Sequence, residues 1–152
     1  MIFKKVVITG GFGFIGKALI KKLRQHDIEV TVIEHPNCSV PSELDDIELI
    51  SCDITNISEI NKIHLEKVDA IIHLAAQSSG PRSFHIPHHD INLNIVGTLN
   101  IIELCIKNSI PRILFASSFV VYGDKLNNIS LPIDEMTSCN PKSIYANSKF
   151  YC

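Results

Sequence analysis

Short apolar runs rich in β-branched residues alternate along this chain with longer segments in which apolar residues recur every three or four positions. The short runs are typical of parallel strands with helices on both faces, and the longer segments are typical of amphipathic helices. The pattern predicts strands over residues 5–9, 29–33, 47–51, 70–74 and 112–116, and helices over residues 13–26, 56–65 and 90–107 and from about residue 143. A loop rich in Pro, Asn and Ser is expected before the last helix.

This order of elements predicts a Rossmann-like α/β fold, a doubly wound parallel sheet with strand order 3-2-1-4-5. Ligands bind to such sheets in the crevice at the carboxyl ends of the strands where the winding reverses, here strands one and four. The helix over residues 90–107 is apolar nearly all round, so it should be buried or lie in an interface. The length of 152 residues predicts a single domain over residues 1–152.

Composition narrows the class of protein. The net charge is −2 and 20% of residues are charged, which gives no field that would recruit nucleic acid or an anionic membrane. No apolar run approaches the roughly 20 residues that span a bilayer, and the N-terminus does not resemble a signal peptide. The five cysteines are scattered without a CxxC pair, so we expect a cytoplasmic protein without structural zinc or disulfides.

A glycine-rich loop, TGGFGFIG, follows the first strand directly and leads into the first helix. Two templates overlap in it: Gly11, Gly13 and Gly16 fit GxGxxG, whereas Gly10, Gly13 and Gly16 fit GxxGxxG. Either template allows a sharp turn, a close approach of backbone to a pyrophosphate, and close packing of helix on strand. The helix N-terminus adds free N–H groups for the phosphates, so the loop predicts a dinucleotide site.

Two carboxylates follow neighbouring strands. Glu34 comes after the second strand, at about the 20-residue spacing from the loop where an acidic residue binds the adenosine ribose. No Arg or Lys occurs in residues 35–44 to bind a 2′-phosphate, so NAD is favoured over NADP. Asp53 follows the third strand, where it could hydrogen-bond the adenine amine or simply be solvated.

Candidate catalytic residues occur near the end of the chain. Tyr145 and Lys149 are four residues apart, so on a helix they lie on one face. A neighbouring ammonium favours the phenolate, which makes the tyrosine a usable base for a substrate hydroxyl. Ser117 and Ser118 follow the fifth strand and could hydrogen-bond the reacting oxygen.

Five motifs in this order, TGGFGFIG, HLAAQSS, NIVGT, SSFVVYG and YANSK, resemble those of the extended short-chain dehydrogenases/reductases. Within that family the chain is similar to the NAD-dependent nucleotide-sugar epimerase/dehydratase group over essentially its whole length. The resemblance implies a catalytic set of Ser118, Tyr145 and Lys149. It implies that the cofactor-binding residues are Gly10, Gly13, Phe14, Ile15, Gly16, Glu34, Asp53, Ile54, Leu74, Ala75, Ala76, Gln77, Asn94, Tyr145 and Lys149. Among these, Asn94 resembles the family's structural asparagine beside the active site.

The same resemblance suggests the chemistry. Dehydratases and decarboxylating members carry acidic residues just after the catalytic Ser or Thr, whereas Phe119 and Val120 occupy those positions here. The chain is therefore similar to the 4-epimerases, which oxidise and reduce C4 of a nucleotide sugar, most commonly a UDP-sugar. Two alternatives stay open: a stand-alone NAD-binding module, and another C4 oxidoreductase or dehydratase of the family.

Family members continue beyond the tyrosine helix with further strands and a C-terminal domain that binds the sugar nucleotide. These 152 residues are thus expected to be an N-terminal part that is inactive alone, with an exposed apolar edge at the fifth strand. In the family the 90–107 helix and the tyrosine helix usually form a homodimer interface.

Other polar residues carry weaker signals. The histidine-rich stretch HIPHHD is expected to be a solvated loop rather than a metal site. His73 is expected to be a packed residue, and Cys52 and Cys105 small hydrophobes.

Overall fold

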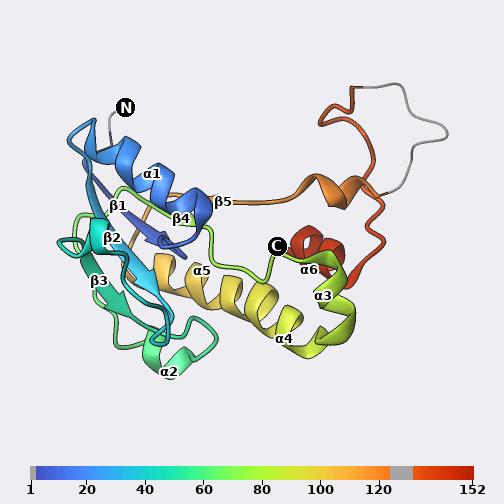
Figure 1. The fold of residues 1–152 in the computed structure, drawn as a ribbon, viewed down its shortest axis with the longest axis horizontal. Coiled ribbons are helices and arrows are strands. Elements are labelled where there is room, and N and C mark those ends of the chain that lie inside the picture. Colours follow the sequence, from blue (N-terminus) through green and yellow to red (C-terminus); the bar gives the residue numbers. More distant parts are fainter. Residues whose placement is uncertain (1–2, 124–131) are drawn as a thin grey trace.

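A parallel five-stranded sheet forms the centre of the computed structural model, which describes residues 3–123 and 132–152 (Figure 1). The strand order β3-β2-β1-β4-β5 confirms the order that the sequence predicts. The strands are β1 (Lys5–Thr9), β2 (Glu29–Glu34), β3 (Glu48–Ser51), β4 (Ala70–His73) and β5 (Ile113–Phe115). All four neighbouring pairs are parallel, so their carboxyl ends lie at one edge of the sheet.

Helices cover both faces of this sheet, with α1 on one face and α5 on the other (Figure 1). The helices are α1 (Phe14–Arg24), α2 (Ile57–Ile60), α3 (Gly80–His85), α4 (Pro87–Ile91), α5 (Gly97–Lys107) and α6 (Ile144–Tyr151). Successive β1 side chains enter different layers: Val6 and Ile8 pack with Ile20 of α1, whereas Val7 packs with Ile101 of α5. This two-sided burial is the reason that the strand reads as a continuous apolar run.

The second helix is shorter than the predicted 56–65 segment. Asn56 caps it by accepting a hydrogen bond from the Ser58 N–H, and the helix ends at Ile60. The chain then continues in tight turns, one of them closed by the Ile63 N–H donating to the Ile60 carbonyl. Ile60 and Ile63 are both buried, so the helical spacing correctly identified the buried face but not the helix end.

The predicted 90–107 helix has more structure around its N-terminus than expected. It begins at Pro87, where the missing N–H and fixed φ of proline suit a helix start, and it contains a π-helical segment, Asn92–Val96. The preceding α3 was not predicted. Its last residue, His85, and the first residues of α4, from Pro87, belong to the stretch that was expected to be a loop. Ser79 caps α3 by accepting a hydrogen bond from the Arg82 N–H.

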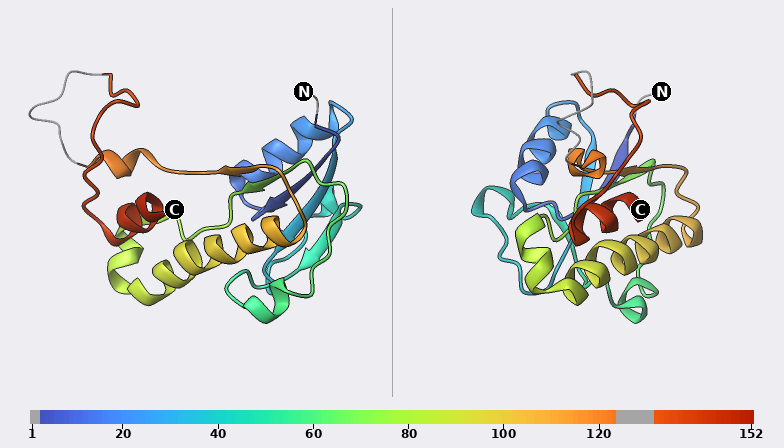
Figure 2. Two further views of the ribbon diagram at one scale, coloured as in Figure 1. Left: turned by 180° about the vertical axis from the view of Figure 1, so that it is seen from behind. Right: turned by 90° about the vertical axis from the view of Figure 1, so that its right-hand side faces the viewer.

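The end of the described chain lies beside these helices: α6 contacts α3 and α4 (Figure 2). β5 is an exposed edge as predicted, since Ile113 and Leu114 remain 38% and 44% exposed. Part of the predicted Pro-, Asn- and Ser-rich loop, residues 124–131, lies outside the described residues. Among the helices described in 3–123 and 132–152, none combines the length and apolarity needed to cross a membrane.

Candidate active site

The glycine loop turns at the carboxyl end of β1, and each of its glycines has a steric reason. Gly10 has a φ of +68°, and a Cβ there would lie 2.8 Å from the backbone of Ala75. A Cβ on Gly16 would lie 2.3 Å from the carbonyl oxygen of Gly11, so only glycine lets helix and loop pack this closely. Gly13 is the N-cap of α1, with a Cβ position 3.3 Å from the Gly10 oxygen.

The N-terminus of α1 leaves room for an anion. The first helical hydrogen bond runs from the Lys17 N–H to the Gly13 carbonyl, and the first turn contains no acidic residue. Phe14 and Ile15 are 94% and 62% exposed, so their side chains are not part of the core. Free N–H groups and the helix dipole together favour a phosphate at this position.

Glu34, at the end of β2, is bonded to the loop. Its carboxylate accepts hydrogen bonds from the N–H groups of Phe12 and His35, both at 3.2 Å. The Gly10 N–H also donates to the Ile33 carbonyl at 3.0 Å, so the loop is attached to β2 at two points. Because each carboxylate oxygen has a second lone pair, Glu34 can still accept hydrogen bonds from ribose hydroxyls.

Asp53 and Ile54 follow β3 but face different ways. The Asp53 carboxylate accepts hydrogen bonds from the Thr55 N–H and hydroxyl and lies 3.9 Å from His35 Nε2, at the rim of the sheet. The Ile54 side chain is 5% exposed and packs against Gly97, so closely that a Cβ on Gly97 would collide with it. The structure therefore brings Asp53 to the rim, whereas the Ile54 side chain lies in the core.

The segment after β4 crosses the glycine loop. The Leu74 N–H donates to the Thr9 carbonyl at 3.1 Å, and the Ala75 N–H donates to the Thr9 hydroxyl at 3.2 Å. Ala76, the next residue, is half-buried, and Gln77 is buried. These four residues thus lead from the glycine loop toward α3.

His73 is buried beneath this crossing, as predicted for a packed residue, and its hydrogen bonds determine its tautomer. The Thr98 hydroxyl donates to the Asn94 carbonyl at 2.5 Å, so it must accept the proton of His73 Nε2 at 3.0 Å. His73 Nδ1 is then the unprotonated nitrogen and accepts from the Thr9 hydroxyl at 2.6 Å. Burial, with a contribution from the Lys149 ammonium, lowers the pKa of His73 to about 4.

Asn94, in the π-helical segment, joins three elements. Its Oδ1 accepts from the Gln77 N–H at 2.9 Å, and its Nδ2 donates to the Gln77 carbonyl at 3.0 Å and to the Ser148 hydroxyl at 3.1 Å. Asn94 is 2% exposed, so these bonds are shielded from water. π-helical turns are frequent at functional sites, and this one directs an asparagine toward the tyrosine helix.

Tyr145 and Lys149 lie on α6 as predicted, and both are buried. The Tyr145 N–H donates to the Ser83 hydroxyl at 3.1 Å, which ties the start of α6 to α3. The Lys149 ammonium donates to the Ala116 carbonyl at 2.9 Å and lies 4.5 Å from the centre of the Phe115 ring. Lys149 is thereby attached to the carboxyl end of β5.

Ser118 follows two residues after that anchor. Its backbone is extended, and its carbonyl accepts from the Val121 N–H at the start of a short 3₁₀ turn, Phe119–Tyr122. Within residues 3–123 and 132–152 no hydrogen bond joins the Ser118 and Tyr145 hydroxyls. The structure thus brings Lys149 and Ser118 to the same strand end without closing a triad of hydrogen bonds.

Sequence reasoning missed the polar residues that hold this site: Ser83, Asp90, Thr98 and Ser148, each at most 3% exposed. The sequence signal that could have identified three of them is helical spacing. Asp90 and Thr98 lie four residues on either side of Asn94, and Ser148 lies three residues after Tyr145, so each pair shares a helix face.

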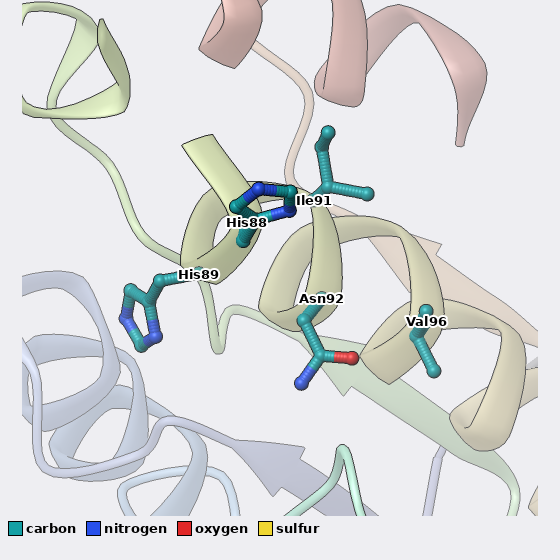
Figure 3. Close-up of a pocket in the computed structure, with 5 residues that line it drawn as sticks. All are labelled: His88, His89, Ile91, Asn92 and Val96. Carbon is teal, nitrogen blue, oxygen red and sulfur yellow. The ribbon is translucent and has the colours of Figure 1, made fainter. Parts of the chain in front are cut away.

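The histidines that precede Asp90 in the stretch HIPHHD do not form a metal site. His88, His89, Ile91, Asn92 and Val96 line a surface hollow on α4 and the π-helical segment, and the two histidine rings point to different sides (Figure 3). Throughout the described 3–123 and 132–152 stretches, no three His, Cys, Asp or Glu residues are grouped to hold a metal.

A family model, the NAD dependent epimerase/dehydratase family, matches residues 6–152. The chain belongs to this family. A putative UDP-glucose 4-epimerase of Methanocaldococcus jannaschii is 34% identical over 147 residues, 95% of this chain and 47% of the relative. A UDP-glucuronic acid decarboxylase 1 of Danio rerio is 35% identical over 127 residues, 80% of this chain and 29% of the relative.

Solved structures agree on the fold. A Thermus thermophilus UDP-glucose 4-epimerase, solved in complex with NAD, superposes with a TM-score of 0.82 at 28% identity and covers 95% of this chain and 47% of its own. The resemblance to nucleotide-sugar epimerases is thus confirmed. The chain spans about half or less of the length of these relatives.

Proposed function

We propose that this chain is the cofactor-binding part of an NAD-dependent nucleotide-sugar 4-epimerase acting on a UDP-sugar. The observation that carries the proposal is the anchoring of Lys149 to the Ala116 carbonyl, one helical turn after Tyr145. This anchor holds the pair at the carboxyl end of β5. The carboxyl end of β1, from which the glycine loop leaves, lies in the same row of strand ends. Ligands of doubly wound sheets bind along that row.

The residues at this edge of the sheet fit NAD. Gly10 and Gly16 let the loop pack closely against Ala75 and Gly11, the start of α1 can bind the pyrophosphate, and Glu34 can bind the ribose. Lys149 would hold the nicotinamide ribose. NAD, when bound, supplies the reversible oxidation of the sugar C4 hydroxyl to a ketone.

The residues of this chain move the proton. A phenol has a reference pKa of about 10, and a nearby cation favours its ionised form. Tyr145, one turn before the Lys149 ammonium, would accept the proton of the C4 hydroxyl and return it when the ketone is reduced. The Ser118 hydroxyl would donate a hydrogen bond to the same sugar oxygen.

The similarity to decarboxylases suggests decarboxylation as a second candidate reaction, but the identity of two residues argues against it. Phe119 is 83% exposed next to Ser118, and Val120 follows it; neither can transfer a proton. A dehydratase or decarboxylase needs a further acid or base beyond the tyrosine, and these positions supply none. Epimerisation needs only hydride return to the opposite face after the sugar ring rotates.

Two experiments test the proposal. Calorimetric titration should detect NAD binding to the purified 152-residue chain, with weaker binding of NADP; no heat at millimolar NAD would contradict a preformed site. The chain alone should not interconvert UDP-galactose or UDP-N-acetylgalactosamine with their C4 epimers. A protein that also carries a sugar-nucleotide-binding domain should do so, and release of a 4-keto-6-deoxy sugar without C4 epimers would refute the epimerase assignment.

A further inference from the structure

A serine hydroxyl on α3 is bonded to the backbone of the candidate catalytic tyrosine. Ser83 is fully buried, and its hydroxyl accepts a hydrogen bond from the Tyr145 N–H at 3.1 Å. The same hydroxyl donates to the Gly80 carbonyl, three residues back in α3, at 2.6 Å. Because a hydroxyl has one proton, the bond to Gly80 uses that proton and leaves the lone pairs of the oxygen for Tyr145. Ser83 is therefore an acceptor of fixed orientation at this position.

The start of α6 needs such an acceptor. The first N–H groups of a helix have no partner within it, and in α6 the first helical bond runs from the Asn147 N–H to the Ser143 carbonyl. Ser143 is the N-cap, and its side chain accepts from the Ala146 N–H at 3.0 Å. Because the Ser143 side chain serves Ala146, the N–H of Tyr145 takes its acceptor from outside the helix. Ser83 supplies this second cap from a different helix.

Other hydrogen bonds hold α6 further along its length. The Lys149 ammonium is bonded to the carbonyl that follows β5. The Ser148 hydroxyl accepts from the Asn94 side chain and donates to the Tyr145 carbonyl at 2.9 Å. A helix of eight residues is too short to be stable by itself, so these contacts determine where it lies. The Ser83 bond differs from them because it acts on the first turn, at the N–H of Tyr145.

α3 is itself held against the segment that leads from the glycine loop. The Ser79 N–H donates to Gln77 Oε1 at 2.6 Å, and the Gln77 side-chain amide donates to the Ser79 carbonyl at 2.9 Å. The backbone of Gln77 is in turn bonded to Asn94. The Ser79 side chain caps α3, and the Ser79 carbonyl also accepts from the Ser83 N–H at 3.1 Å. Ser83 therefore connects Tyr145 to a segment that the buried residues Gln77 and Asn94 hold in place.

We propose that Ser83 is a positioning residue for Tyr145: its buried hydroxyl caps the first turn of α6 from α3 and so fixes where the backbone of the tyrosine lies. The catalytic meaning of this role rests on the proposed function, because it assumes that the Tyr145 phenol exchanges a proton with the substrate. A misplacement of about 1 Å can lower the rate of such a step about a hundredfold. The structural part can be measured without turnover.

Amide hydrogen exchange, followed by NMR in the 152-residue chain, measures this bond at the Tyr145 N–H. Ser83→Ala removes the hydroxyl from a buried site without adding atoms. Ser83→Thr retains a hydroxyl, which in a helix can bond the same carbonyl three residues back. Ser143→Ala is the matched control, because it removes the other cap bond of the same helical turn, the one to Ala146. The Tyr145 ring is followed with ¹³C-labelled tyrosine, its resonance being assigned with Tyr145→Phe.

Ser83→Ala should speed exchange of the Tyr145 amide about tenfold and shift the Tyr145 ring resonance, while exchange of the Ala146 amide changes by less than about twofold. Ser143→Ala should do the reverse, with fast exchange at Ala146 and a protected Tyr145 amide, and Ser83→Thr should keep Tyr145 protected. An unchanged Tyr145 amide in Ser83→Ala would overturn the proposal. Equal loss of protection at both amides in the two alanine variants would also overturn it, because the helix would then simply fray, as would a Ser83→Thr chain that loses as much protection as Ser83→Ala.

A kinetic measurement separates the positioning role from the proposed function. In a protein that also carries a sugar-nucleotide-binding domain, Ser83→Ala should lower kcat for C4 epimerisation about tenfold or more and change NAD affinity by less than about twofold, because Ser83 acts through the tyrosine alone. Equal kcat values of the unmodified and Ser83→Ala proteins would overturn the catalytic part of the proposal. If the unmodified protein does not epimerise while the exchange results hold, the proposed function fails and the positioning of Tyr145 by Ser83 stands.

Discussion

His73 should make the folded chain sensitive to acid. Its neutral ring accepts from Thr9 and donates to Thr98, so a second proton on Nδ1 would leave the Thr9 O–H without its acceptor and place a charge in the core. The ordinary pKa of 6.5 applies to the unfolded chain, and burial lowers the folded value to about 4. The unfolded state therefore binds more protons between these values, and stability falls as pH drops through that window.

The size of the effect follows from the two pKa values. At 1.36 kcal/mol for each unit, the separation of the two values corresponds to a total loss of about 3 kcal/mol. Most of it should appear between pH 7 and pH 4.5, and none of it above pH 7.5. A loss of this size is a large fraction of the 5–15 kcal/mol that is typical of domain stability.

The assay is urea unfolding followed by circular dichroism at several pH values. His73→Leu should be less stable at pH 7.5, because it leaves two threonine hydroxyls without their partner, but its stability should fall less steeply toward pH 4.5. His26→Gln, at an exposed histidine, is the control for the general effect of acid and should retain the slope of the unmodified chain. Equal slopes for all three proteins would refute the assignment of a buried neutral His73.

Three further outcomes are expected. Gly10→Ala should destabilise the chain by about 2 kcal/mol in urea unfolding, because its φ is +68° and the new methyl would meet the Ala75 backbone, whereas Gly80→Ala, where nothing lies within 4 Å, should be neutral or stabilising. Glu34→Gln should weaken NAD binding about tenfold in calorimetry through the loss of a charge-assisted hydrogen bond to the ribose. Leu99→Glu should shift any dimer toward monomer in light scattering, because Leu99 is a 54% exposed apolar residue on α5.

Each of these has a result that contradicts it. Equal stabilities of the two alanine variants would mean that the positive φ of Gly10 carries no strain. Unchanged NAD affinity in Glu34→Gln would remove the ribose role of that carboxylate. A dimer that withstands Leu99→Glu, with Glu103→Gln as an exposed control on the same helix, would place the interface elsewhere.

Several features were predictable because their causes are local in sequence. The strand order followed from short apolar runs alternating with helical segments, and the loop glycines marked the turn into α1. Tyr145 and Lys149 were found by their four-residue spacing. The helix ends were less accurate: α2 ends at Ile60 rather than near residue 65, and α4 begins at Pro87 rather than at residue 90, because the apolar period does not report where a helix starts or stops.

The sequence by itself determined the fold class, the family and the position of the candidate catalytic pair, because period, glycine placement and motif order are properties of neighbouring residues. Only the tertiary structure decided how that pair is held. The bonds of Asn94 to Gln77 and Ser148 cross 17 and 54 positions, and that of Thr9 to His73 crosses 64. Whether a polar residue such as Asp90 is solvated or buried depends on such long-range packing.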